Sequence, residues 1–150
     1  MIPPTIITWI LLLFGLITCA PLLCIQFLLI RDPRGKTARD LVIGKDKEWR
    51  DDTHFLSAFG GSVADWTIFA PLFFLGTIGV LAGSVWGYIL YAGAGAIMLY
   101  INVVLWFQEK KHVYPLVGPV AYYTYYWGDF VYWGIASILY AVIRLNGGVV

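Results

Sequence analysis

Two acids stand within long apolar stretches of this chain, where a carboxylate is costly unless protein groups, water or a partner satisfies it. Asp65 lies in a stretch from about residue 62 to 82, and Asp129 lies in one from about 117 to 144. An ionised carboxylate there needs a cation, a water-filled cavity or strong donors, whereas a protonated one bonds to a hydroxyl group. These acids are therefore the first candidates for chemistry.

Aromatic residues surround Asp129 in the sequence. If 117–144 is one α-helix, successive residues turn by about 100°, and several side chains fall within about 60° of Asp129 on one face. They are Tyr122, Tyr125, Tyr126, Tyr132, Trp133, Ala136 and Tyr140. Aromatic faces attract cations and stack on flat apolar groups, so this face predicts a pocket for a cationic or amphipathic ligand.

Two other apolar stretches each place polar and small residues on one helical stripe by the same arithmetic. One stripe holds His54, Ser57, Ala58, Gly61 and Asp65, and the other holds Tyr91, Gly95, Met98, Asn102 and Glu109. We expect the stripes to face one another around a shared cavity that contains Asn102 and both acids. The alternative is that they form hydrogen bonds between helices and bind no ligand.

Two carboxylate and histidine pairs are spaced as helical neighbours, because residues three apart share a face. Asp51 precedes His54, and Glu109 precedes His112. This pattern resembles the ligand pattern of di-iron and di-manganese carboxylate proteins, which implies a metal site formed by these four residues. The adjoining Lys110 and Lys111 favour a plain cluster of charges at the membrane surface instead. No cofactor is identified by the sequence.

The elements that position these residues follow from composition. The chain has 150 residues, of which 60% are hydrophobic and 13% are charged. Its long uncharged runs exceed the roughly 10-residue alternating strands of a membrane barrel, so helices must satisfy the backbone in lipid. We therefore predict an all-α integral membrane four-helix bundle in a single transmembrane domain. The expected spans are about 5–30, 62–82, 85–107 and 117–144, with a short interfacial helix near 37–42 in the first polar connection.

The basic residues are distributed unevenly between the connections. All ten Lys and Arg residues except Arg144 lie in the stretches 31–61 and 108–116, which are on the same side of the membrane if there are four spans. By the positive-inside rule these connections are cytoplasmic and both chain ends face outward. Glycine and alanine are dense in 85–107, which predicts close packing of that helix against its neighbours.

Composition and charge leave three classes of membrane protein as candidates for the function. A net charge of +1 with no block of like charges gives no reason to expect nucleic acid. The first hypothesis is a protein that binds or transports an amphipathic or cationic small molecule or lipid. The alternatives are a membrane enzyme that uses acid/base or metal-dependent redox chemistry on a lipid-soluble substrate, and a structural subunit. The expected partners are the lipid bilayer, a hydrophobic or cationic small molecule, and further copies or a larger membrane complex.

Overall fold

The computed structural model describes residues 2–150, and every regular element among them is a helix. The elements are α1 (Ile6–Arg31), α2 (Lys36–Ile43), α3 (Asp52–Ala64), η1 (Asp65–Phe69), α4 (Ala70–Leu81), α5 (Val85–Gln108), α6 (Lys110–Ala121), η2 (Tyr122–Tyr126) and α7 (Gly128–Leu145). Four helical stretches are long and apolar enough to cross a membrane: Ile6–Arg31, Asp52–Leu81, Val85–Gln108 and Pro115–Leu145. The prediction of an all-α integral membrane protein with four spans is confirmed.

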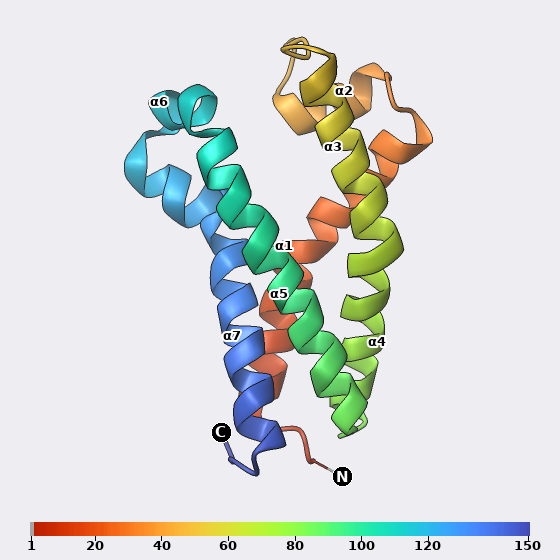
Figure 1. Cartoon of the computed structure of the whole chain (residues 1–150), viewed down its shortest axis with the longest axis vertical. Coiled ribbons are helices and arrows are strands. Elements are labelled where there is room, and N and C mark those ends of the chain that lie inside the picture. The colour runs from red at the N-terminus through yellow and green to blue at the C-terminus, as the bar shows by residue number, and fades with distance from the viewer. Residues whose placement is uncertain (1) are drawn as a thin grey trace. The chain divides into compact units, whose positions relative to one another are not determined.

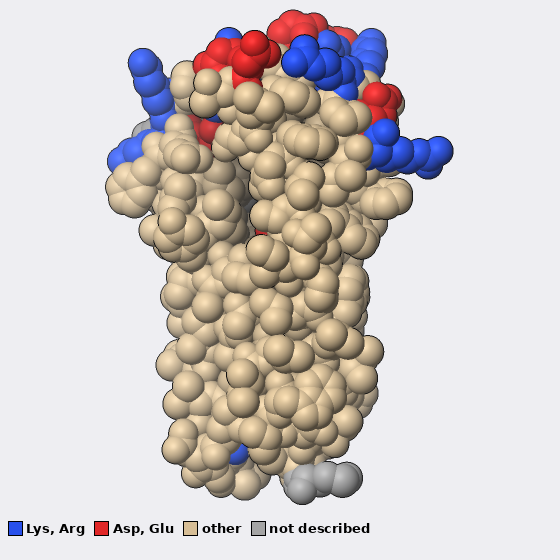
Figure 2. Space-filling view, turned by 45° about the vertical axis from the view of Figure 1, so that its right-hand side comes forward, with Lys and Arg blue, Asp and Glu red and all other residues tan. Residues whose placement is uncertain are grey.

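The outer surfaces of these helices are apolar. Large side chains such as Ile17, Ile78 and Leu139 are exposed although they lie within membrane-spanning stretches. The space-filling view shows a surface without charged side chains along most of the helical length (Figure 2). Such a surface is unfavourable in water and suits the hydrocarbon of a bilayer.

The chain forms two compact units. The first contains residues 1–18 and 72–150 and is called the bundle unit below, and the second is the Cys19–Pro71 unit. The division falls within α1 and next to Pro71, so the two halves of α1 belong to different units.

Four helical segments pack together in the bundle unit: the first half of α1, most of α4, α5 and α7 (Figure 1). At the centre, the Trp133 Nε1–H donates to the Tyr91 hydroxyl over 3.1 Å, and that hydroxyl donates to the carbonyl of Leu11 over 3.1 Å. The Phe73 ring meets the Trp133 ring edge-on at 5.6 Å. Side chains of α4, α5 and α7 and a backbone carbonyl of α1 therefore meet in one aromatic and hydrogen-bonded core.

Glycine permits a close contact between α5 and α7 in this unit. A Cβ at Gly95 of α5 would lie 2.9 Å from the Gly134 carbonyl oxygen, and one at Gly134 of α7 would lie 2.6 Å from the Gly95 carbonyl oxygen. The two backbones approach each other because neither residue has a side chain, which is how small residues pack membrane helices. The prediction of close packing along 85–107 is confirmed here.

Both chain ends lie at the same end of the bundle unit (Figure 1). The Ile2 N–H donates to the Gly83 carbonyl over 2.9 Å in the turn between α4 and α5. The Thr8 hydroxyl is hydrogen-bonded to the Tyr140 hydroxyl, and Arg144 donates to the carbonyl of Pro3. These contacts attach the first residues of the chain to the turn between α4 and α5 and to α7.

The fourth predicted span is interrupted. Gly118 has φ 78° and ψ 169°, outside the helical region, because Pro119 disfavours a helical conformation at the residue before it. Trp127 has φ −129° and ψ −19°, and it separates the π-helical turn η2 from α7. The assumption that 117–144 is one unbroken α-helix is wrong, since α7 begins only at Gly128.

The Cys19–Pro71 unit contains the second half of α1 with α2, α3 and η1. Leu29, Ala38 and Phe55 form its buried core, and Trp49 and Phe59 pack against them. The helix expected near residues 37–42 is α2. The second membrane-spanning stretch starts as a helix at Asp52, whose predecessor Asp51 caps it, whereas the apolar sequence placed the span from about residue 62.

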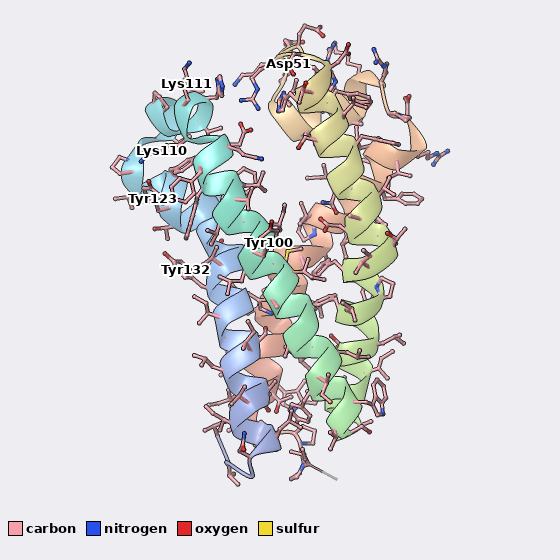
Figure 3. The ribbon with its side chains drawn as sticks, in the orientation of Figure 1. Asp51, Tyr100, Lys110, Lys111, Tyr123 and Tyr132 are labelled. Atoms are coloured by element: carbon pink, nitrogen blue, oxygen red, sulfur yellow. The ribbon has the colours of Figure 1, made fainter. Side chains whose placement is uncertain are left out.

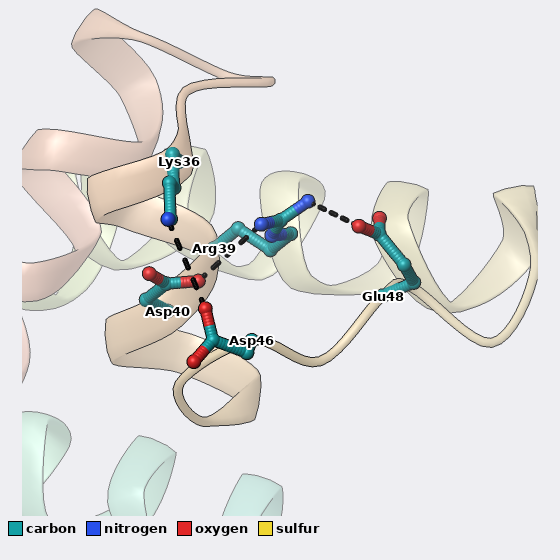
Figure 4. Close-up of polar contacts among 5 residues, drawn as sticks. All are labelled: Lys36, Arg39, Asp40, Asp46 and Glu48. Atoms are coloured by element: carbon teal, nitrogen blue, oxygen red, sulfur yellow. Dashed lines mark hydrogen bonds and ion pairs between the residues drawn. The ribbon is translucent and has the colours of Figure 1, made fainter.

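Ion pairs join α2 to the connection between α2 and α3. The Arg39 guanidinium lies 2.6 Å from a Glu48 carboxylate oxygen and 3.5 Å from one of Asp40, while Lys36 lies 3.8 Å from Asp46 (Figure 4). The Arg39 side chain is only 19% exposed, so its pairs are better shielded from water than those of Lys36. The basic residues of this connection are therefore partly neutralised by its own acids.

Candidate functional site

Asp65 is held by an amide from the opposite helix within the Cys19–Pro71 unit. The Gln26 Nε2–H donates to the Asp65 carboxylate over 2.5 Å, which joins α1 to the first residue of η1. Asp65 lies near the middle of the Asp52–Leu81 stretch and is half-buried. It forms no ion pair with any residue that the structure describes. An acid at membrane depth is thus satisfied by one neutral donor.

Gln26 has further capacity for hydrogen bonding. Its Oε1 atom is buried and has no hydrogen-bond partner among the described groups. A buried acceptor without a donor costs about 1–3 kcal/mol, so it is an unusual feature that favours a ligand or water at this position. Together, Gln26 and Asp65 present two acceptor groups that are suited to a cation or to N–H donors.

A proline explains why Asp65 begins a π-helical turn. Pro71 has no N–H and its ring conflicts with the carbonyl four residues earlier, so the regular ladder of hydrogen bonds is disturbed before it. The Ala70 N–H instead donates to the Asp65 carbonyl, five residues back. Such single turns often occur at functional sites, and here the turn fixes the position of the acid.

Trp66 lies beside Asp65 in η1 and contacts α1 in two ways. Its Nε1–H donates to the Leu23 carbonyl over 3.0 Å, and its ring lies 5.5 Å from that of Phe27. With Cys24 and Leu28, the two rings line an apolar pocket of about 360 Å³. The unit therefore combines an acid, an amide and an apolar pocket within one pair of helices.

Asp129 occupies a different environment from the one predicted. It lies in the first turn of α7, in the bundle unit, rather than midway along an unbroken helix. The partial positive charge of a helix N-terminus stabilises a carboxylate at this position. The shared cavity with Asp65 stays a prediction, because the two acids belong to different units.

The aromatic residues predicted around Asp129 do not share one face. Tyr122 is buried, and its hydroxyl donates to the Trp106 carbonyl over 2.5 Å. Trp133 is buried in the central core, whereas Tyr132 is 47% exposed and points outward from α7 (Figure 3). The side chains of Tyr125 and Tyr126 lie outside those that the structure describes. The break at Trp127 changes the helical phase between Tyr122 and Asp129, so the prediction of one aromatic face is wrong for Tyr122. Within α7, the neighbours Tyr132 and Trp133 differ in burial.

Asn102 is buried in α5 and is satisfied within its own helix. Its Nδ2–H donates to the Met98 carbonyl over 2.9 Å. This contact accounts for the amide donor locally, and a ligand-binding role for Asn102 stays a prediction.

The four predicted metal ligands lie in two units. Asp51 accepts a hydrogen bond from the His54 backbone N–H over 2.8 Å, which makes it the N-cap of α3 (Figure 3). Glu109 and His112 lie at the junction of α5 and α6, beside Lys110 and Lys111. Among the described residues, no group of three or more His, Cys, Asp or Glu side chains is placed to hold a metal ion. A metal at these positions stays a prediction.

The sequence alone does not single out Gln26. It is the sole carboxamide among residues 1–30, a stretch without any charged side chain, and this was the available signal. Its pairing with Asp65 depends on how α1 and η1 pack, which helical periodicity within one element does not reveal.

Comparison with protein-family models, with curated proteins and with solved structures finds no match to this chain.

Proposed function

We propose that this membrane protein binds a cationic amphipathic molecule, with Asp65 and Gln26 as the acceptors for its charged group. The single observation that carries the proposal is the buried Gln26 Oε1 atom without a donor, next to a carboxylate that has no cationic partner among the described residues. An ammonium group supplies both a positive charge and N–H donors, so it satisfies both acceptors at once.

The apolar part of the ligand packs in the pocket beside Trp66 in this proposal. That pocket is lined by Cys24, Phe27, Leu28 and Trp66. Trp66 is the residue that follows Asp65 in the sequence. The rings also favour a nearby cation through the negative electrostatic potential of their faces. An alkylammonium molecule is the simplest compound with both properties.

The proposal also includes the orientation of the chain in the membrane. The connections 31–61 and 108–116 face the cytoplasm and both chain ends face outward, as the excess of Lys and Arg in those connections favours.

Dodecylammonium and dodecanol test the proposal as a matched pair, since they share a chain and differ in charge and donors. The full chain is placed in lipid nanodiscs, and binding is measured by equilibrium dialysis with empty nanodiscs subtracted. We expect saturable binding of dodecylammonium, weakened about tenfold or more in Asp65→Asn, because a charge-assisted hydrogen bond is lost.

Asp52→Asn is the control, because Asp52 is an acid whose side chain is 88% exposed outside this site. Its dodecylammonium affinity should stay within about twofold of the parent's, since an exposed acid interacts weakly with a distant cation. Equal affinity of the parent and Asp65→Asn, with both folded, would contradict the proposal. Such a result would indicate that Asp65 and Gln26 only join the two helices.

A further inference from the structure

The bundle unit contains a buried cation, Arg144. Arg144, in the last turn of α7, is 3% exposed and belongs to the bundle unit. Its Nη2–H donates to the Pro3 carbonyl, and its guanidinium lies 5.9 Å from the centre of the Tyr140 ring. Its Nε–H is buried without a hydrogen-bond partner among the described groups. All the contacts recorded for this cation are therefore with neutral groups.

The surrounding chain contains no acidic side chain that neutralises Arg144, and among the described residues Arg144 forms no ion pair, with the terminal carboxylate included. Residues 1–30, 66–108 and 130–150 contain no Asp or Glu, and these ranges supply the helices that pack at this end. The nearest acid along α7 is Asp129, which is roughly 22 Å away at 1.5 Å per residue. A buried cation without a counter-charge is strongly unfavourable, so an anion from outside the chain would stabilise it.

The structure provides space for that anion. Arg144 lines a pocket of about 230 Å³ together with Ile2, Pro3, Thr5, Gly147, Gly148 and Val149. Since a water molecule occupies about 30 Å³ of liquid, this volume exceeds the space of several waters. Gly147 has φ 82° and turns the chain after α7, and neither Gly147 nor Gly148 adds a side chain to the pocket beside Arg144.

We propose that Arg144 and this pocket bind a phosphate group at the membrane surface. A guanidinium presents several N–H donors in a plane and matches the oxygens of a phosphate better than a lysine does. The pocket lies at the ends of membrane-spanning helices, where lipid headgroups meet the protein. The phosphate group therefore comes either from a phospholipid or from the aqueous phase.

Native mass spectrometry of the full chain released from phosphatidylglycerol nanodiscs provides the first test. We expect the parent to retain phospholipid and Arg144→Gln to retain about tenfold less, because a charged hydrogen-bond donor is lost. Arg31→Gln is the matched control, since Arg31 also ends a membrane-spanning helix but is exposed. It should retain as much lipid as the parent. Equal losses in the two variants would overturn the proposal, since they would indicate general attraction of basic residues to lipid.

Solid-state NMR on the parent chain keeps the test decisive if Arg144→Gln does not fold. The arginine Cζ atoms are labelled with ¹³C. In phosphatidylglycerol bilayers the parent chain should show a ¹³C–³¹P coupling, and Arg31→Gln should show the same coupling. In phosphate-free galactolipid bilayers the coupling should vanish if a phospholipid is the source. It should return on addition of inorganic phosphate if the source is free phosphate. Absence of the coupling in both bilayers, with inorganic phosphate present, would overturn the proposal.

Discussion

At the scale of single residues, the two intramembrane acids differ in what surrounds them. Asp65 accepts from the Gln26 amide beside a buried acceptor that has no donor. Asp129 lies in the first turn of α7, where the helix itself supplies favourable partial charges. The sequence identified both acids from their unusual position, but the contacts that separate them depend on packing and on a helix break. Only the structure shows that Gln26 reaches Asp65.

Asp129→Asn tests the role of the helix terminus. We expect this substitution to lower the free energy of unfolding by about 0.3–1 kcal/mol, because a neutral amide interacts less with the helix N-terminus. Dodecylammonium affinity should be unchanged, since the bound cation is placed at Asp65. Thermal unfolding and equilibrium dialysis measure the two effects. A folded Asp129→Asn chain that no longer binds the cation would restore Asp129 to the binding site.

At the scale of helices, hydropathy predicted the number of spans but not their interruptions. The hydropathy of a membrane-spanning segment is averaged over many residues, so a local irregularity in the helix changes it little. Four spans were therefore predictable from the sequence. The π-helical turns and the break at Trp127 arise from single contacts. For example, a Cβ at Gly128 would lie 2.0 Å from the Tyr123 carbonyl oxygen, so the chain path there requires glycine. Prolines signal such sites without fixing their geometry.

Two glycines of α5 offer a matched test of helix packing. Gly95→Ala should lower the free energy of unfolding by about 1–3 kcal/mol, because the new Cβ meets α7 backbone at 2.9 Å and overpacks the contact. Gly93→Ala adds the same group two residues away, where the nearest atom is the Leu72 Cδ1 at 3.9 Å. It should leave stability unchanged or raise it by up to about 1 kcal/mol through helix propensity.

Denaturant unfolding of both variants in the same detergent measures the difference. Equal stability of Gly95→Ala and Gly93→Ala would show that α5 and α7 do not make this close contact.

At the scale of the whole molecule, this integral membrane protein has nine of its ten Lys and Arg residues in two connections. Single cysteines in a background without Cys19 and Cys24 test the proposed sidedness. We expect a membrane-impermeant maleimide added to intact cells to label Val149→Cys, which is 86% exposed. Lys45→Cys and Lys111→Cys should react only after the membrane is opened. The reverse pattern would place the charged connections outside.

A crystal structure of the full chain with dodecylammonium, grown in a lipidic phase, tests cation binding at Asp65 and Gln26 most directly. We predict that the ammonium nitrogen lies at hydrogen-bond distance, about 2.7–3.2 Å, from both the Asp65 carboxylate and the Gln26 Oε1 atom. The alkyl chain should occupy the pocket beside Trp66. A bound ammonium group elsewhere, with the contact between Gln26 and Asp65 unchanged, would contradict the account.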